Sequence, residues 1–422
     1  MARRARVRDP RLSATTRGGT VKANRWRCWS VLAVLTLALA ALTAAGCGSD
    51  DDGGDGASGG GDALTKVGKA EGEVDLVAWA GYVEDGSTDP AVDWVSDFEK
   101  DTGCKVNVKV GNTSDEMVTL MRTGNYDGVS ASGDATLRLI AGGDVAPVNT
   151  DLVPNYADVF DSLKGQPHNT VDGKAYGVPH GRGANLLMFN KDVVKPAPDS
   201  WSVVFGGPES EPYKGKVTAY DNSIYIADAA LYLRATQPDL GIDNVYELDD
   251  KQFQAAVDLL KQQREAIGEY WSDYTKEQAA FTSGDSVVGT TWQVIANLIE
   301  ADKKSPPIEA ILPKEGATGW SDTWMISSEA KHPNCMYRWM DHIISPKANA
   351  AVAEWFGEAP SNSKSCAETA VKNHCEIFHA DDEAYFDKVE YWTTPRKECG
   401  DDRGATCKDY SEWVKAWTEI KG

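Results

Sequence analysis

Short apolar segments alternate with amphipathic segments from residue 73 onward. Val92, Val95 and Phe98 are spaced to share one face of a helix, whereas the segments on either side have the length and composition of buried strands. The first series runs strand, helix, strand, helix, strand, at residues 74–78, 90–102, 105–110, 115–123 and 126–129. Such a series predicts the α/β class, with a mainly parallel, doubly wound sheet.

The ends of both helices carry start and stop signals. Asp89 can cap the first amides of the first helix, Pro90 suits its first position, and Gly103 ends it. Ser114 and Gly124 are predicted to have the corresponding roles in the second helix.

The later part of the chain repeats this alternation. Further strands are predicted at residues 186–189, 287–290, 308–312 and 323–326, and helices at residues 250–265 and 294–302. The chain is too long for one core, so we expect two lobes, one of residues 73–181 with 321–363 and one of residues 182–320 with 364–422. Open α/β sheets bind ligands beyond the carboxyl ends of their strands, which here are the loops at residues 79–85 and 130–134.

The first 46 residues have the pattern of a signal peptide. They hold nine Lys and Arg residues and one acidic residue, and they end in an apolar run of about 15 residues. The segment Ala44-Ala45-Gly46-Cys47 resembles a lipobox, so Cys47 is predicted to be acylated and to hold the protein at the outer face of the cytoplasmic membrane. The alternative is cleavage by the ordinary signal peptidase, with Cys47 as a bystander. Residues 48–62 consist only of Gly, Ser, Asp and Ala, which predicts that residues 47–72 form a flexible tether.

The net charge of the chain limits the kinds of partner that it is expected to bind. Without the signal peptide, the 43 basic and 64 acidic residues become 34 and 63, a net charge of −29. A nucleic acid is therefore not an expected partner, whereas cationic solutes are attracted to such a protein.

Six cysteines remain after Cys28 and Cys47 are set aside, and an even number in an exported protein predicts three disulfides. Their short spacings favour the pairs 366–375 and 399–407, which leaves 104 with 335, although six cysteines permit 15 pairings. The six are Cys104, Cys335, Cys366, Cys375, Cys399 and Cys407. A metal site of Cys366, His374, Cys375 and His379 is the alternative, but its spacing matches no common zinc pattern.

Catalytic motifs are missing from the sequence. It contains no G-x-S-x-G, H-E-x-x-H or P-loop segment, and no G-x-G-x-x-G after a strand. We therefore expect a protein that is not an enzyme and that carries no cofactor or metal.

Tryptophan is the residue type that points to a ligand. Trp79, Trp292, Trp320 and Trp324 lie at or near predicted strand ends. Aromatic faces attract ammonium groups by ~0.5–2 kcal/mol each. Trp324, inside a strand, is assigned to the core, whereas Trp79 and Trp320 lie beside polar or acidic residues and are assigned to a ligand site.

Several segments resemble the spermidine/putrescine-binding proteins of ABC transporters. The segments are VAWAGY at residues 77–82, DFEKDTG at 97–103, Tyr126-Asp127 before Ser132, residues 179–190, and PKEG at 313–316. The resemblance implies a type II periplasmic-binding-protein fold of two α/β lobes that close on one ligand. It further implies a monomer that delivers its ligand to the permease subunits of an importer.

The resemblance also implies site residues. Trp79 and Tyr82 match the first aromatic loop, Ser132 matches a serine of the next loop, and Trp320 and Asp322 match an aromatic and a carboxylate that hold an amine. Trp292 matches a further aromatic wall.

This sequence departs from the family at other site positions. Two carboxylates are replaced near Ile224 and Val294, while Asp134 and Glu358 stand where the family has Ser or Tyr and can restore negative charge. Arg182 replaces an aromatic and can bind a ligand carboxylate. The alternative for Arg182 is an ion pair within the protein.

The leading interpretation is therefore a lipoprotein that binds a small cationic amine, such as putrescine or spermidine. The nearest alternative keeps the fold and binds a zwitterionic amino acid or an amine-containing acid through Arg182. An exported enzyme and a structural surface protein are hypotheses of other classes.

Overall fold

The computed structural model describes residues 63–400 and 404–422. The predicted signal peptide and Cys47 lie outside these residues. Within the described part of the chain, no helix is both long and apolar enough to cross a membrane.

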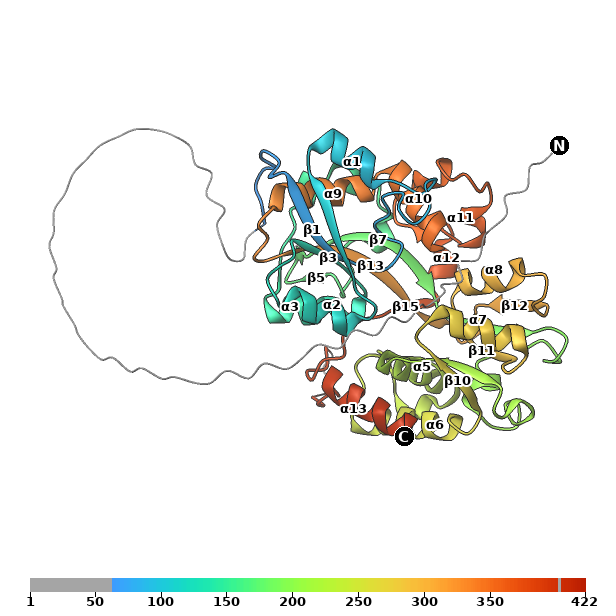
Figure 1. Ribbon diagram of the computed structural model, residues 1–422. Coiled ribbons are helices and arrows are strands. Elements are labelled where there is room, and N and C mark those ends of the chain that lie inside the picture. Colours follow the sequence, from blue (N-terminus) through green and yellow to red (C-terminus); the bar gives the residue numbers. More distant parts are fainter. Residues whose placement is uncertain (1–62, 401–403) are drawn as a thin grey trace, which may run out of the picture. The chain divides into compact units, whose positions relative to one another are not determined.

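The larger of two main sheets contains the first strands of the chain (Figure 1). Its strand order is β14-β7-β13-β3-β1-β2, and β15 and β4 also pair with β13. The bounds are β1 Glu73–Ala78, β2 Lys105–Val110, β3 Gly128–Ala131, β4 Val145–Ala146, β7 Val178–Ala184, β13 Ala317–Ser327, β14 Ala359–Pro360 and β15 Val389–Tyr391.

The second sheet is built from the middle of the chain, in the order β10-β9-β11-β8-β12. Its strands are β8 Leu186–Asn190, β9 Val217–Tyr220, β10 Ile267–Trp271, β11 Val288–Thr291 and β12 Ile308–Ile311. A separate hairpin joins β5 Thr170–Val171 to β6 Lys174–Ala175.

Helices cover both faces of the larger sheet because its strands alternate apolar side chains. Val74 and Leu76 pack with residues of α1 and α9 on one face, whereas Val77 packs with residues of α2 and α3 on the other. The bounds are α1 Val95–Thr102, α2 Ser114–Met121, α3 Gly133–Gly142 and α9 Pro333–Ile343.

The second sheet is covered in the same way. Leu187 and Phe189 of β8 face a core shared with α4 Ser202–Phe205, α5 Ile226–Thr236, α6 Asp250–Gln263 and α13 Tyr410–Lys421. Met188 faces a second core with α7 Tyr274–Ser283 and α8 Gln293–Ala301. The remaining helices are α10 Pro346–Phe356, α11 His374–Ile377 and α12 Glu383–Phe386.

The α/β class is confirmed, but both sheets are mixed rather than mainly parallel. The predicted parallel pairing holds for β1 with β2 and β3, and for β9 with β10 and β11. The strands β7, β8 and β13 run antiparallel to most of their neighbours. The lobe boundaries expected after residues 181 and 320 fall inside β7 and β13.

The first helix begins five residues later than predicted. The Asp89 carboxylate accepts from the Ala91 amide and starts a turn, whereas the Asp93 carboxylate accepts from the Ser96 amide at the true helix start. In the second helix, Thr113 rather than Ser114 caps the first turn, by accepting from the amide of Glu116.

The favoured disulfide pairing is confirmed. Cys104 is bonded to Cys335, Cys366 to Cys375 and Cys399 to Cys407. The alternative metal site is wrong, because its two cysteines are bonded to each other.

The Cys104–Cys335 bond closes the longest loop, with a sequence separation of 231. Replacing both cysteines by Ala should lower the free energy of unfolding by about 5 kcal/mol through the entropy of the unfolded chain. The matched control is the Cys366 and Cys375 double replacement, which opens a separation of only 9 and should cost about 3 kcal/mol. Urea denaturation measures both, and a larger loss in the control would contradict the prediction.

Candidate functional site

Three predicted site residues meet at the carboxyl ends of β1 and β3. Tyr82 follows β1, Ser132 follows β3, and Asp322 lies in the neighbouring strand β13. The Tyr82 hydroxyl donates to Asp322 Oδ2 at 2.7 Å, and the Ser132 hydroxyl donates to Asp322 Oδ1 at 2.6 Å. The Asp322 carboxylate is therefore held in one orientation by residues from two loops.

Glu358, just after α10, joins the same group. Its Oε2 lies 3.0 Å from the Tyr82 hydroxyl, and its Oε1 lies 3.4 Å from His180 Nε2. The approach depends on Gly181 of β7, because a Cβ atom there would come within 2.3 Å of the Glu358 carboxyl carbon. The strand thus leaves room for this carboxyl group.

Asp134 contributes a further carboxylate from the first turn of α3. Its Oδ1 accepts from the Ser114 hydroxyl at 2.9 Å, and its Oδ2 is buried without a hydrogen-bond partner. Asp134, Asp322 and Glu358 are 1%, 3% and 0% exposed. A buried carboxylate oxygen that lacks a partner is costly, which makes this group of side chains a candidate site.

Burial is the main cause of the pKa shifts of the three carboxyl groups. It raises the pKa of Asp134 and the pKa of Asp322 to about 6. Burial and the charge of Asp322 raise the pKa of Glu358 well above its ordinary value. His180 cannot neutralise Glu358, because burial lowers its pKa to about 3.

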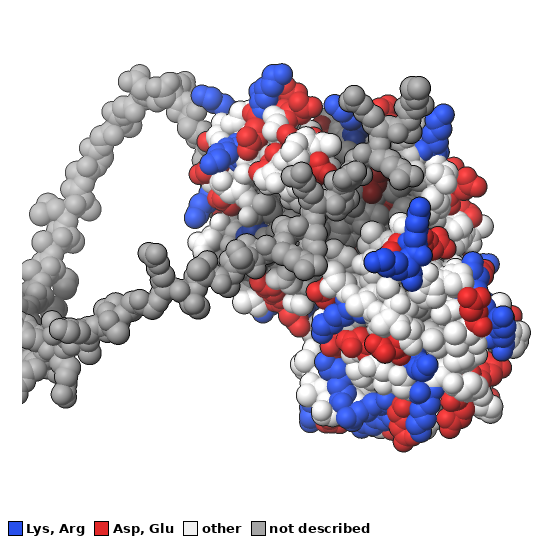
Figure 2. Space-filling model, turned by 45° about the vertical axis from the view of Figure 1, so that its right-hand side comes forward, with Lys and Arg blue, Asp and Glu red and all other residues white. Residues whose placement is uncertain are grey.

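No basic side chain in residues 63–400 or 404–422 forms an ion pair with Asp134 or Asp322. The positive charge of Arg138 lowers the pKa of Asp134, but the Arg138 guanidinium forms its ion pair with Asp115. Acidic and basic side chains are interspersed on the face shown in Figure 2.

Tyr82 has one proton but contacts two carboxyl groups. If it donates to Asp322, the bond to Glu358 requires a proton on Glu358, which agrees with the direction of the Glu358 pKa. Both contacts of Tyr82 are therefore satisfied together when Glu358 carries a proton and Asp322 is charged.

Aromatic rings adjoin the carboxylates in a continuous series. Ring centroids lie 4.5 Å apart for Tyr82 and Phe356, 5.9 Å for Phe356 and Trp320, and 6.5 Å for Trp320 and Trp292. The series continues from Trp292 to Tyr220 at 5.4 Å, and Tyr220 stacks on Trp392 at 5.7 Å.

The family model that describes bacterial extracellular solute-binding proteins matches residues 93–379. The chain belongs to this family. The spermidine/putrescine-binding periplasmic protein of Escherichia coli K12 is 24% identical over 341 residues, which cover 80% of this chain and 89% of the relative.

Solved structures agree on the fold of this solute-binding protein. The spermidine/putrescine ABC transporter substrate-binding protein of Streptococcus pneumoniae is 16% identical, with a TM-score of 0.63 over 82% of this chain and 97% of that one. A Treponema pallidum lipoprotein is 17% identical, with a TM-score of 0.61 over 83% and 99%. The predicted type II periplasmic-binding-protein fold is confirmed.

Arg182 of the solute-binding protein lies on the other face of the sheet. Along β7, Gly181 pairs with Asp322 and Gly183 with Trp320, whereas Arg182 pairs with Ser321. Since successive side chains alternate between faces, Arg182 points away from the carboxylates.

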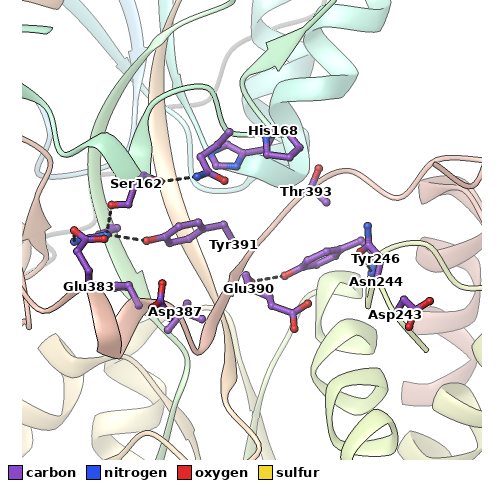
Figure 3. Close-up of a pocket in the computed structure, with 15 residues that line it drawn as sticks. Ser162, His168, Asp243, Asn244, Tyr246, Glu383, Asp387, Glu390, Tyr391 and Thr393 are labelled. Atoms are coloured by element: carbon purple, nitrogen blue, oxygen red, sulfur yellow. Dashed lines mark hydrogen bonds and ion pairs between the residues drawn. The ribbon is translucent and has the colours of Figure 1, made fainter. Parts of the chain in front are cut away.

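The Arg182 guanidinium is bound within the protein through both terminal nitrogens, whereas its Nε has no hydrogen-bond partner among the described residues. It donates to Glu383 at 3.0 Å, to the Ala380 carbonyl at 2.9 Å and to Ser162 at 3.1 Å, and it lies 3.8 Å from the Phe386 ring centroid. It borders a cavity of about 430 Å³ whose other lining residues include His168, Tyr246 and Tyr391 (Figure 3). Arg182 thus forms the internal ion pair that was its alternative, on the face away from Asp322, and its contact with a ligand stays a prediction.

Trp324 and Trp79, which were also singled out in the sequence, differ in burial. Trp324 is fully buried and donates from its indole to His180 Nδ1 at 3.1 Å, so its assignment to the core is confirmed. Trp79 is only partly buried and packs against two core clusters, with its indole nitrogen unpaired. Its contact with a ligand stays a prediction.

Sequence reasoning missed five neighbours of the site, namely Ser114, His180, Tyr220, Phe356 and Trp392. Tyr220 ends β9, the position at which a ligand residue is expected, but no strand was predicted there. Trp392 enters only through the pairing of β15 with β13, which no local pattern signals.

The variant Arg182→Met tests whether Arg182 stabilises the fold or contacts the ligand. Loss of several charged hydrogen bonds should lower the free energy of unfolding by about 2 kcal/mol. Because the guanidinium points away from Asp322, the affinity for amines should stay within about twofold, as measured by calorimetry. A tenfold change in affinity would show that Arg182 acts in the site.

Proposed function

We propose that this protein captures a small cationic amine of the putrescine or spermidine type and delivers it to the permease of an ABC importer. The observation that carries the proposal is the group of buried carboxylates, Asp134 and Asp322 above all, with no cationic partner among the described residues. An ammonium group supplies the missing charge and the missing hydrogen bonds.

The aromatic series supports the same ligand class. Trp320, Trp292 and Tyr220 offer faces that suit both methylene groups and ammonium groups. The relatives support the same class, since they include a spermidine/putrescine-binding protein and a putrescine/agmatine-binding protein.

Desolvation also gives a reason for ligand-dependent closure. Without a cation, burying the charged carboxylates of Asp134 and Asp322 costs free energy, and a bound amine removes that cost. We further propose that the protein acts outside the cytoplasmic membrane, held there by a lipid on Cys47, and that it has no enzymatic activity.

Asp322→Asn tests the central contact. The amide keeps the size of the side chain and removes the charge; its single oxygen can accept from only one of the Tyr82 and Ser132 hydroxyls, and its NH2 group faces the other. We expect spermidine and putrescine to bind at least tenfold more weakly, which corresponds to about 1.4 kcal/mol. Isothermal titration calorimetry measures the change.

The control for this variant is Asp199→Asn, an exposed carboxylate that pairs only with Lys314 at the surface. It should leave the dissociation constant unchanged. Equal affinities in Asp322→Asn and the unmodified protein would remove Asp322 from the site, whereas binding of γ-aminobutyrate or an amino acid in place of diamines would replace the proposed ligand class.

Amine affinity should fall at acidic pH. In the ligand-free protein the two Asp carboxyls have pKa values of about 6, so protons compete with the amine below that pH, while aliphatic amines stay charged. The affinity should be constant above about pH 7 and should fall by roughly tenfold per pH unit for each carboxyl below pH 6. Titrations from pH 5 to 8 that gave one constant value would contradict this account.

The contribution of these two carboxyls to the stability of the ligand-free protein should change with pH in the opposite direction to the amine affinity. Both pKa values are raised above the ordinary 3.8, so the folded state holds these protons more tightly than the unfolded state. The two carboxyls therefore favour folding most below about pH 4, and this contribution is lost as the pH rises through 6. Asp322→Asn should remove its share of that pH dependence, as read from urea denaturation.

A further inference from the structure

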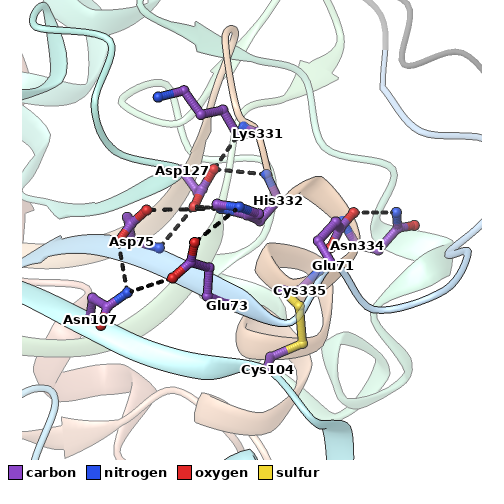
Figure 4. A network of polar contacts seen from close by, with 10 residues as sticks. All are labelled: Glu71, Glu73, Asp75, Cys104, Asn107, Asp127, Lys331, His332, Asn334 and Cys335. Atoms are coloured by element: carbon purple, nitrogen blue, oxygen red, sulfur yellow. Dashed lines mark hydrogen bonds and ion pairs between the residues drawn. A yellow bond between two sulfur atoms is a disulfide. The ribbon is translucent and has the colours of Figure 1, made fainter.

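A second group of polar side chains lies at the amino end of β1, away from the loop that carries Tyr82. Glu73 and Asp75 project from β1, and His332 immediately precedes α9 (Figure 4). One potential ligand atom from each of the three residues lies within 4.8 Å of the others.

Asp127 fixes the imidazole of His332. Its Oδ1 accepts from the amides of Lys331 and His332, and its Oδ2 accepts from the Asp75 amide at 2.8 Å. The same Oδ2 lies 2.8 Å from His332 Nδ1. A carboxylate bound by this many donors is an acceptor only, so Nδ1 carries hydrogen and Nε2 is left to bind something else.

His332 Nε2 faces Glu73 Oε1 at 3.7 Å. This separation is too long for a hydrogen bond. A metal ion between the two atoms fits it, because Zn²⁺ lies about 2.0–2.2 Å from both imidazole nitrogen and carboxylate oxygen.

Asn107, on the neighbouring strand β2, orients the two carboxylates. Its side-chain amide donates to Glu73 Oε2 at 3.2 Å and to Asp75 Oδ1 at 3.0 Å. Those bonds engage one oxygen of each carboxylate. The other oxygens face the imidazole, Glu73 Oε1 at 3.7 Å from Nε2 and Asp75 Oδ2 at 3.9 Å from Nδ1. The arrangement has the outer hydrogen bonds that metal ligands ordinarily have.

We propose that Glu73, Asp75 and His332 bind one divalent transition-metal ion of the Zn²⁺ type. One imidazole and two carboxylates suit Zn²⁺, whereas Ca²⁺ requires six to eight oxygen ligands. The side chains of Glu73 and Asp75 are 49% and 31% exposed, so water can complete the coordination.

The ion would join β1 to the start of α9, beside the Cys104–Cys335 disulfide that links the same part of the fold (Figure 4). This site is independent of the amine site, which lies beyond the carboxyl end of β1. Metal binding thus adds a second stabilising link between segments that are distant in the sequence.

The test is a calorimetric titration of the untagged, oxidised protein with ZnCl₂ after chelator treatment and dialysis. We expect one ion per chain and a rise in the melting temperature on addition of Zn²⁺. His332→Gln should weaken binding at least 100-fold, and Asn107→Ala, which removes only an outer hydrogen bond, about tenfold.

His379→Gln is the matched control, since His379 is a partly exposed histidine that contacts Asp382. Its Zn²⁺ affinity should equal that of the unmodified protein. Glu73→Gln is the second variant, in case His332→Gln fails to fold. It leaves the start of α9 unchanged and should also abolish tight Zn²⁺ binding. Absence of stoichiometric Zn²⁺ binding, unchanged binding in Glu73→Gln, or a preference for Ca²⁺ would overturn the proposal, and none of these outcomes bears on amine binding.

Discussion

The desolvation of Asp134 and Asp322 is the constraint on which the site depends. Each carboxylate is buried with hydrogen-bond donors that orient it, namely Ser114, Ser132 and Tyr82, but with no ion pair among the described residues. Neutral donors offset part of the cost of removing the charge from water, and the pKa values of about 6 show that the rest is not offset. A cation in the same place would restore the balance, which connects the electrostatics of the fold directly to its ligand.

Strand geometry decides which side chains reach that site. Gly181 and Gly183 of β7 make room for Glu358 and Trp320, and the intervening Arg182 is directed to the opposite face. The two faces of one strand therefore serve different purposes. One leaves room for the Glu358 carboxyl and the Trp320 ring, while the other buries the Arg182 guanidinium against Glu383 and the Ala380 carbonyl.

Much of this could be predicted from the sequence. The strand–helix pattern located β1, β2 and α2 closely, the cysteine spacings favoured the correct disulfides, and the family resemblance brought Tyr82, Ser132 and Asp322 to one place. The direction of Arg182 was missed because β7, with the sequence VPHGRGA, has no apolar alternation and is a strand only through its pairing with β13 and β14. Tyr220 and Trp392 were missed because they meet through tertiary packing of segments about 170 residues apart.

The most direct test of the central claim is a crystal structure of the protein with putrescine bound at pH 7.5. We expect an ammonium nitrogen within hydrogen-bond distance of Asp322, with the methylene chain against Trp320 and the second nitrogen directed toward Asp134. Putrescine bound elsewhere, for example in the cavity beside Arg182, with Asp134 and Asp322 left without a cation, would contradict it.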